Sequence, residues 1–188
     1  MADLVNPKRT IARVLAGLVI AVSALTLGLT LKACVGPGPA VAPTTMAVTI
    51  SGSVFNLDLA IDEATRNKGL GDRTSIAPTG GMLFSFKTSD KREFVMRDCV
   101  IPIDIIFLDG TGRVTNKHKM TVEPPRGEGE GISGDYQNRA YSLRLKRYSS
   151  RYSAKYAIEL AGNTLDTLKI EIGDQIELDT KTLDRFTR

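Results

Sequence analysis

Apolar and polar residues alternate along the chain from Met46 onward, with the two-residue period of a half-buried strand. The apolar face of the first long strand consists of four residues, Phe55, Leu57, Leu59 and Ile61. Asp62 follows directly and is a suitable N-cap for a short helix over residues 63–68, which Gly69 would end. The folded part is therefore predicted to begin with β-structure and one short helix.

The remainder of the chain carries further strand signals. Strands are predicted over residues 82–86, 93–96, 103–108, 113–118, 155–160, 168–172 and 175–178. Residues 103–108 are nearly all apolar, which is typical of a central strand, and Asp109 to Gly112 form a turn. This pattern predicts a mainly β (α+β) fold, a compact barrel or sandwich of short strands with one or two short helices. The domain is expected over residues 46–182, with 183–188 as a tail.

The N-terminal region has a different pattern. Residues 14–31 are an uncharged and mostly apolar run, preceded by Lys8, Arg9 and Arg13. This run is just long enough to cross a bilayer, and the positive charge before it keeps the N-terminus in the cytoplasm. Residues 1–34 are therefore predicted to be a membrane signal or anchor, with the domain on the extracytoplasmic side. Residues 35–45, rich in Pro and Gly, are predicted to be an extended linker.

Three fates of this N-terminal region remain open. Residues 31–34, Leu-Lys-Ala-Cys, resemble a lipobox, which makes Cys34 a candidate for lipidation, although a lysine is unusual there. Residues 40–42, Ala-Val-Ala, fit a signal-peptidase site, but Pro43 directly after them disfavours cleavage. The apolar run is longer than the core of a usual signal peptide, which favours an uncleaved anchor.

Charge and composition exclude several classes of function. The net charge is +4, but residues 1–34 hold four Lys and Arg against one Asp, so 4 − 1 = +3 lies there and +1 remains. A nucleic-acid partner is therefore not expected. His118 is the only histidine and there is no CxxC, so we expect no zinc site, and we interpret His118 as an exposed strand residue. No glycine-rich phosphate motif is present, and no cofactor or metal is expected.

A long loop is predicted at residues 123–154. Its first half is acidic and rich in Gly, whereas its second half is basic, and all five tyrosines lie in or just after it. Loops of this length inside a small domain are usually functional or disordered. Two readings remain open: a solvated loop whose tyrosines pack partly on the domain, or a surface for an anionic envelope partner.

Successive motifs along the domain resemble those of a known family. They are residues 60–73, 81–84, 94–98, 101–109, 112–114, 158–162 and 173–174. In this order they resemble the domain of unknown function 192 family of prokaryotic, often exported proteins, over about residues 55–178. The resemblance implies a β-rich fold and export, but no established reaction. The sequence departs from the family pattern at Gly71, Val95, Asp98 and Cys99, where Met, Trp, Asn and Thr are usual, so a pocket shaped by those residues would be altered.

Asp104 is the most informative polar residue, because it lies in the apolar run of residues 103–108. An unpaired buried carboxylate is costly, so Asp104 must be hydrogen-bonded, paired or facing a cavity. It either ties a loop through backbone N–H groups or faces a ligand. Arg73 is the expected partner of Asp104 or Asp98, because a guanidinium pairs with a carboxylate through two hydrogen bonds.

These residues define a candidate binding site. Its members are Arg73, Met96, Arg97, Asp98 and Asp104, although Met82 and Met96 are simpler to read as core residues and Cys99 as a buried thiol. The leading hypothesis is a membrane-tethered accessory domain that binds a small molecule, a glycan or an envelope component. The alternative is a hydrolase or transferase that uses Asp98 and Asp104 as a carboxylate pair.

Overall fold

One mixed β-sheet forms the body of the domain in the computed structural model, which describes residues 41–188. Its six strands within these residues lie in the order β1–β2–β3–β6–β4–β5. Their bounds are β1 (Thr45–Ile50), β2 (Ser53–Ala60), β3 (Gly80–Phe94), β4 (Ile103–Leu108), β5 (Val114–Met120) and β6 (Tyr148–Ala161). Only β2 and β3 are parallel, and the other neighbours are antiparallel. The predicted mainly β fold is confirmed.

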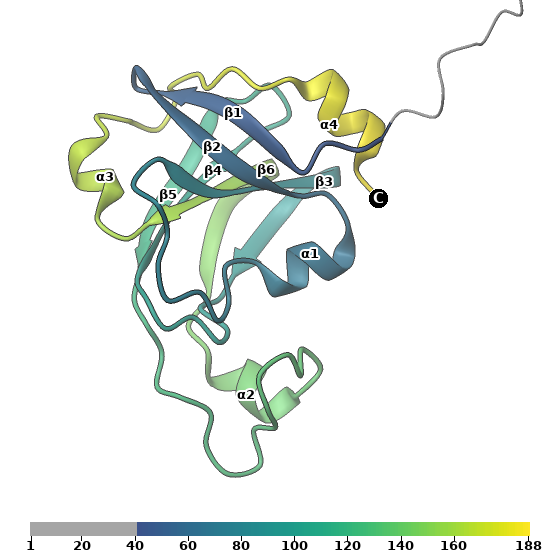
Figure 1. The fold of residues 1–188 in the computed structure, drawn as a ribbon, viewed down its shortest axis with the longest axis vertical. Coiled ribbons are helices and arrows are strands. Elements are labelled where there is room, and N and C mark those ends of the chain that lie inside the picture. Colours follow the sequence, from purple (N-terminus) through teal and green to yellow (C-terminus); the bar gives the residue numbers. More distant parts are fainter. Residues whose placement is uncertain (1–40) are drawn as a thin grey trace, which may run out of the picture. The chain divides into compact units, whose positions relative to one another are not determined.

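Short helices connect and flank the strands (Figure 1). They are α1 (Glu63–Lys68), α2 (Arg139–Arg144), α3 (Thr164–Thr167) and α4 (Thr180–Phe186). Helix α1 lies in the crossover between the parallel strands β2 and β3, a connection that parallel pairing requires. The helix begins at Asp62, whose side chain accepts a hydrogen bond from the N–H of Thr65 at 2.9 Å, and it ends at Gly69. Both predicted ends of this helix are confirmed.

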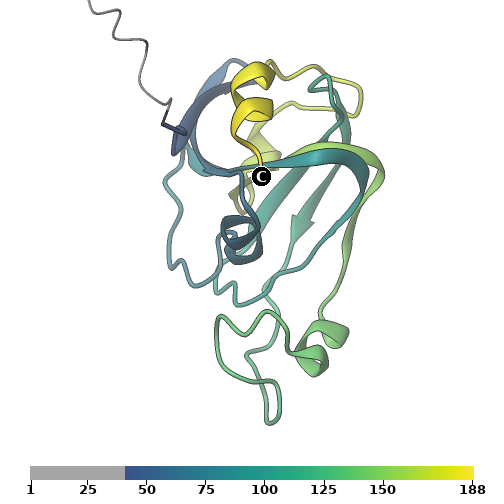
Figure 2. The same cartoon turned by 90° about the vertical axis from the view of Figure 1, so that its right-hand side faces the viewer.

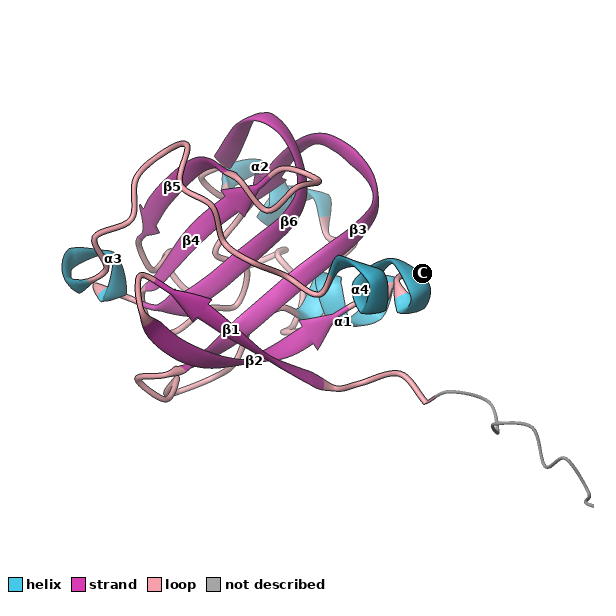
Figure 3. Cartoon of the chain, turned by 90° about the horizontal axis from the view of Figure 1, so that it is seen from above, coloured by secondary structure: helices cyan, strands magenta, loops and turns pink. Residues whose placement is uncertain are grey.

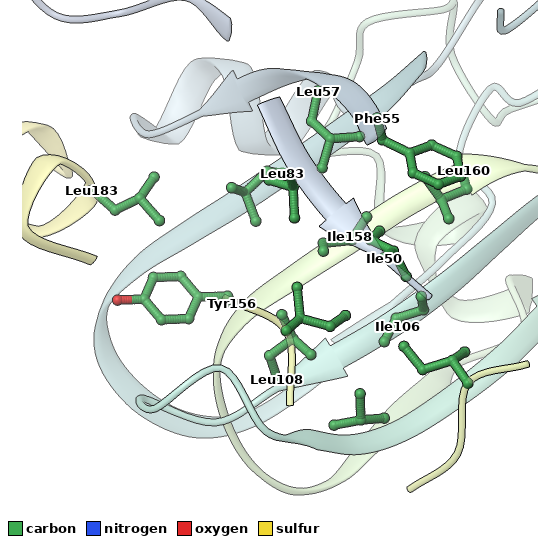
Figure 4. Packing of buried hydrophobic residues seen from close by; sticks show 14 of the residues in the cluster. Ile50, Phe55, Leu57, Leu83, Ile106, Leu108, Tyr156, Ile158, Leu160 and Leu183 are labelled. Atoms are coloured by element: carbon green, nitrogen blue, oxygen red, sulfur yellow. The ribbon is translucent and has the colours of Figure 1, made fainter. Parts of the chain in front are cut away.

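Hydrophobic clusters cover both faces of the sheet, because successive residues of the central strands point to opposite sides. On β4, Ile106 and Leu108 belong to one cluster, whereas Ile105 and Phe107 belong to the other. Figure 4 shows the first cluster, in which residues of β1, β2 and α4 pack against β3, β4 and β6. The second cluster, on the opposite face, contains residues of β3, β4 and β6 together with Leu70 and Met96. Strand β4 is an interior strand, as its composition predicts.

The central strands β3 and β6 are longer than the sequence pattern predicts. They run side by side, bend together (Figure 2), and contain register shifts between Ser85 and Asp90 and between Lys91 and Glu93. In Figure 3 the β1–β2 hairpin crosses one side of this curved sheet. Of the predicted strand at residues 93–96, only residues 93 and 94 belong to a strand, as the end of β3, whereas the predicted strand at 155–160 is part of β6.

The C-terminal region differs most from the sequence prediction. Residues 168–172 and 175–178 are not strands; Gln175 forms an isolated bridge with Arg113. Their apolar residues Leu168, Ile170 and Ile176 are nevertheless buried, so the pattern marked burial rather than strand pairing. Residues 183–188, expected to be a tail, include the end of α4, in which Leu183 is buried.

Residues 1–40 lie outside the described part of the chain, and with them the predicted anchor, most of the linker and Cys34. Among residues 41–188, no helix has the length and apolar character that a bilayer-spanning segment needs.

Candidate functional site

Glu159 is a buried acid at the middle of the sheet. It lies on β6, opposite Met82 of β3 on one side and Ile105 of β4 on the other. Alternation along β6 places it on the same face as Ala157, among residues of the second hydrophobic cluster. Only 5% of Glu159 is exposed.

The carboxyl group of Glu159 is incompletely satisfied. Its Oε2 atom is buried and has no hydrogen-bond partner among the described residues. Burial raises the pKa of Glu159 to about 8, and the N–H of Leu70 and the charge of Arg73 lower it only in part. Glu159 is therefore mostly protonated at neutral pH, and it can donate one hydrogen bond as well as accept others.

A cavity of about 530 Å³ lies next to Glu159. It is lined by α1, β3, the segment after β3 and the long loop: Arg66, Asn67, Lys68, Gly69, Leu70, Phe84, Phe86, Glu93, Phe94, Val95, Arg97, Cys99, Tyr136, Gln137, Arg147 and Glu159. The volume is in the range of small-molecule sites. Gly69 lies beside the Glu159 carboxyl group, since a Cβ at this position would be in ordinary contact with Oε2, at 3.6 Å.

Aromatic rings form one wall of this cavity. The ring of Phe94 packs edge-on against Phe84 and Phe86, with centroids 5.0 and 6.3 Å apart. These rings form an apolar surface, while Glu159 and the Lys and Arg side chains of the lining offer polar contacts. The lining is therefore mixed, with an apolar wall on one part and charged and amide side chains on the rest, so that a ligand with both an apolar body and polar groups would fit it.

Asp98, a predicted site residue, is engaged by Arg126 rather than by Arg73. The two oxygens of Asp98 accept hydrogen bonds from Nε and Nη2 of Arg126 at 2.7 and 2.9 Å, and both side chains are about nine-tenths buried. The hydrogen bonds from Arg126 lower the pKa of Asp98. A hollow of about 460 Å³ lies beside this pair, but the Asp98 carboxylate is already paired.

Asp104 is buried as predicted, but its predicted pairing with Arg73 is wrong. Its Oδ2 accepts a hydrogen bond from the N–H of Leu165 at 2.7 Å, which ties β4 to α3. Burial raises the pKa of Asp104, and the N–H groups of Leu165 and Asn163 oppose that shift. Arg73 instead pairs with Asp58 at 2.6 Å in a partly exposed position. Of the two readings of Asp104, the structure supports the backbone tie.

The remaining candidates occupy different places. Met96 is fully buried in the second cluster, as a core residue. Arg97 lines the cavity and holds the long loop through the carbonyl oxygen of Tyr136 at 2.7 Å. Asp104 shares the sheet face of Ile106, whereas Met96 belongs to the cluster on the other face, so the five predicted residues do not form one site.

Two positions at which the sequence departs from the family pattern border the cavity. Val95 and Cys99 both line it. Burial raises the pKa of the Cys99 thiol to about 12, so this side chain lines the cavity as a neutral thiol and is not activated as a nucleophile. His118, expected to be exposed, is half-buried, and its Nε2 lies 2.8 Å from the carbonyl oxygen of Ser149.

The long loop is held together by its own ion pairs. Arg144 binds Glu130 through Nε and Nη2 at 2.6 and 2.8 Å, and Arg126 lies over the ring of Tyr141. Tyr141 and Tyr148 are buried, whereas Tyr152 is 57% exposed. These contacts support the reading in which most of the tyrosines pack on the domain.

Comparison with known families agrees with the motifs. The model of the DUF192 family, described as "Uncharacterized ACR", matches residues 46–178. The chain belongs to the DUF192 family. No curated protein matches the chain.

Solved structures with the same fold include two bacterial proteins. One, from Sinorhizobium meliloti 1021, is described as a proposed transcription regulator; it has 26% sequence identity and a TM-score of 0.55, and the match covers 74% of this chain and 97% of that one. The other, a protein of unknown function from Novosphingobium aromaticivorans, has 29% identity and a TM-score of 0.55, with 74% and 92% covered.

Glu159 is the residue that sequence reasoning missed. It was noted only within the motif at residues 158–162. An acid between Ile158 and Leu160 reads as the polar face of a half-buried strand. Lys155 and Ala157 share that face by alternation, so the sequence alone does not show that the face is buried; the neighbouring strands β3 and β4 bury it.

Proposed function

We propose that this protein is an exported, membrane-tethered accessory protein whose folded domain binds a small molecule in the cavity at Glu159. The observation that carries this proposal is the buried Oε2 atom of Glu159, which has no hydrogen-bond partner within residues 41–188. Nearly all buried polar atoms in native proteins are hydrogen-bonded. A ligand in the adjacent cavity would supply the missing contact.

The position of Glu159 supports binding because the burial of its carboxyl group is only partly compensated: the N–H of Leu70 faces the group, but Oε2 has no partner among the described residues. An apolar side chain would pack better between Met82 and Ile105, and a buried group without a partner costs about 1–3 kcal/mol. The backbone tie made by Asp104 shows the contrast, since that carboxylate joins two elements. A buried polar atom that is left without a partner calls for an explanation, and a bound ligand supplies one.

The alternative, a hydrolase or transferase that uses Asp98 and Asp104, has less support. Asp98 is held by Arg126, and Asp104 by the N–H of Leu165. The two acids thus contact different segments and share no partner. A carboxylate pair for acid–base chemistry needs both groups at one reacting atom.

The proposed location rests on the N-terminal sequence. The apolar run at residues 14–31 follows Lys8, Arg9 and Arg13, and Cys34 comes shortly after it. Full-length protein should fractionate with membranes and be accessible to protease from the extracytoplasmic side. Lipid labelling that disappears in Cys34→Ala would assign the anchor to Cys34, whereas recovery in the soluble cytosol would contradict tethering.

A glycan or an anionic envelope component remains a candidate ligand. The long loop offers less free surface for such a partner than its sequence suggests, because Tyr141 is buried and Arg126 and Arg144 are paired. Nucleic acid is not proposed, since residues 35–188 carry a net charge of only +1, obtained as +4 − 3. The regulatory role suggested for the Sinorhizobium protein is therefore not carried over to this chain.

A ligand screen tests the binding proposal directly. The full-length protein, held in mild detergent, is screened by thermal shift against sugars, organic acids, amines and peptides. Glu159→Leu removes the polar group while keeping the apolar packing, and Glu177→Gln, on an exposed acid, is the matched control. We expect compounds that raise the melting temperature of the native protein and of Glu177→Gln but not of Glu159→Leu. Equal shifts in all three proteins would contradict binding at Glu159.

A further inference from the structure

The rim of the Glu159 cavity carries more positive than negative charge. Its cationic side chains come from α1, the segment after β3 and the end of the long loop: Arg66, Lys68, Arg97 and Arg147. Glu93 is the other acid in the lining, and it lies 3.7 Å from Arg147 in an exposed pair. An exposed pair of this length neutralises little of the rim's charge.

Two of these cations are fixed in place by main-chain and hydroxyl oxygen atoms. Arg97 donates from Nη1 to the carbonyl oxygen of Tyr136 at 2.7 Å and from Nη2 to the hydroxyl of Ser142 at 3.1 Å. Arg66 donates from Nη1 to the main-chain oxygen of Ser85 at 3.1 Å and from Nη2 to the main-chain oxygen of Arg188 at 2.7 Å. A guanidinium held in this way stays charged and still has further N–H groups that can donate. Such prior fixing lowers the entropy lost when an anion binds.

The interior of the cavity does not oppose an anion. Because the pKa of Glu159 is raised to about 8, the carboxyl group is largely neutral at pH 7. Cys99 also stays neutral, since burial raises its pKa to about 12. The rings of Phe84, Phe86 and Phe94 form an apolar wall of the same cavity.

We propose that the cavity takes a small organic anion, whose carboxylate or phosphate group contacts the cations of the rim while its apolar body packs on the three phenylalanine rings. A hydroxyl, carbonyl or acid oxygen at the inner end of the ligand contacts Glu159. This inference rests on the proposed binding function and narrows it to one class of ligand. The rim cations form ion pairs with an anionic ligand, whereas a neutral or cationic ligand would form none with them.

A set of aromatic probes of nearly equal size tests the charge preference. Benzoate, phenyl phosphate, benzamide and benzylamine are titrated into the full-length protein in detergent at pH 7, and heats are measured by calorimetry. We expect benzoate or phenyl phosphate to bind at least about 10-fold more tightly than benzamide, and benzylamine most weakly. A preference between the two anions identifies carboxylate or phosphate as the natural group.

Variants of the rim cations distinguish specific binding of the anion at the rim from nonspecific attraction to positive charge elsewhere on the protein. Lys68→Gln combined with Arg147→Gln removes two exposed charges, and we expect it to weaken benzoate binding about 3- to 10-fold without changing benzamide. Lys181→Gln, on exposed α4, is the control for loss of positive charge elsewhere. Equal loss in the control, or no loss in the rim variant, would overturn the assignment of the anion to the rim.

The pH dependence provides a second, independent readout. The groups that face Glu159 or line its cavity include titratable and charged side chains of α1, β3 and the loops: Arg66, Lys68, Arg73, Glu93, Arg97, Cys99, Tyr136 and Arg147. As pH rises from 7 to 9, ionisation of Glu159 should repel the bound anion, and benzoate affinity should fall by about 10-fold. In Glu159→Gln this fall should disappear; if it persisted, another group would be responsible, and the placement of the anion in the cavity of Glu159 would be wrong.

The outcomes also distinguish failure of this inference from failure of the proposed function. If benzamide or benzylamine binds as tightly as benzoate and Glu159→Leu abolishes binding, the cavity is a ligand site but the anion class is wrong. If none of the four probes binds and the thermal-shift screen gives no ligand that depends on Glu159, both proposals fail.

Discussion

Arg126 donates two hydrogen bonds to the carboxylate of Asp98, at 2.7 and 2.9 Å, and both side chains are about nine-tenths buried. The same guanidinium donates to the carbonyl oxygens of Glu130 and Asp135 and lies over the ring of Tyr141. One ion pair therefore joins the segment after β3 to much of the long loop.

Breaking this pair should be strongly destabilising. Asp98→Ala or Arg126→Ala leaves a buried charge without its partner, and we expect each to lower the free energy of unfolding by about 3–5 kcal/mol. The double variant should cost less than the sum of the two, as measured by urea unfolding. The exposed pair of Lys119 and Asp166 is the control, with an expected coupling below about 1 kcal/mol.

Acid should remove the contribution of Asp98. Arg126 lowers the pKa of Asp98 in the folded state, so the stabilisation is present above the unfolded value of 3.8 and is lost as pH falls through the folded value. The coupling energy measured at pH 7 should therefore shrink at pH 2. An undiminished coupling at that pH would show that the pair acts by packing rather than by charge.

Asp104 and Arg73 should behave as independent residues. Asp104→Ala loses the hydrogen bond to Leu165 and should cost about 1–3 kcal/mol, whereas Arg73→Ala breaks a partly exposed pair with Asp58 and should cost at most about 1 kcal/mol. In a double-mutant cycle the two effects should add within about 0.5 kcal/mol. Coupling well above this value would mean that the two side chains meet in solution.

The free energy of unfolding should fall as pH rises from about 4.5 to about 8, because in this range Glu159 is protonated in the folded protein but ionised in the unfolded chain. Its folded pKa is about 8, against 4.5 for an ordinary glutamic acid. Between these values the unfolded chain binds fewer protons, so the free energy of unfolding falls by up to about 1.4 kcal/mol per pH unit and levels off above pH 8. Denaturation of Glu159→Gln measured at the same pH values should lack this slope. A slope shared by both proteins would assign it to another group.

Cys99 should react slowly with alkylating reagents. With a pKa of about 12, its thiolate fraction at pH 8 is about 10⁻⁴, so iodoacetamide should label it at least about 100-fold more slowly than a free thiol. The measurement uses mass spectrometry on Cys34→Ala protein, which leaves Cys99 as the single cysteine. Urea should restore the ordinary rate; rapid labelling of the folded protein would show that the thiol is exposed or activated.

Local patterns predicted the elements whose sequence and structure agree. The alternation of Phe55, Leu57 and Leu59 marked β2, and the cap at Asp62 marked α1. The apolar run of β4 indicated an interior strand, and it is one. In each case the signal lies within the element itself, so one sequence is sufficient to read it.

The parts that could not be predicted depend on contacts between distant residues. Residues 168–172 have a strand-like pattern, yet they form no ladder with the edge strand β5, whose main-chain hydrogen bonds in this region go to Gly173 and Asp174, next to the isolated bridge at Gln175. Ile170 is buried without joining the sheet. Likewise, the partner of Asp98 could not be predicted. Arg126 lies in the long loop, where no helix or strand pattern indicates which part of the domain its side chain contacts. The buried state of Glu159 depends on strands on both its sides, which only the assembled sheet reveals.

Strands β3 and β6 are neighbours at the centre of the sheet, although β4, β5 and the long loop all lie between them in the sequence. Strand β4 can form its local hairpin with β5 early, but it joins the β1–β2–β3 group only through β6. The sheet therefore cannot be completed until residue 161 is available, and strands that form earlier would leave unpaired inner edges of the kind that promotes aggregation. Such non-local closure is slow. The domain must fold after its synthesis is nearly complete, and the exposed inner edges of β3 and β4 are where a chaperone would protect it in the meantime.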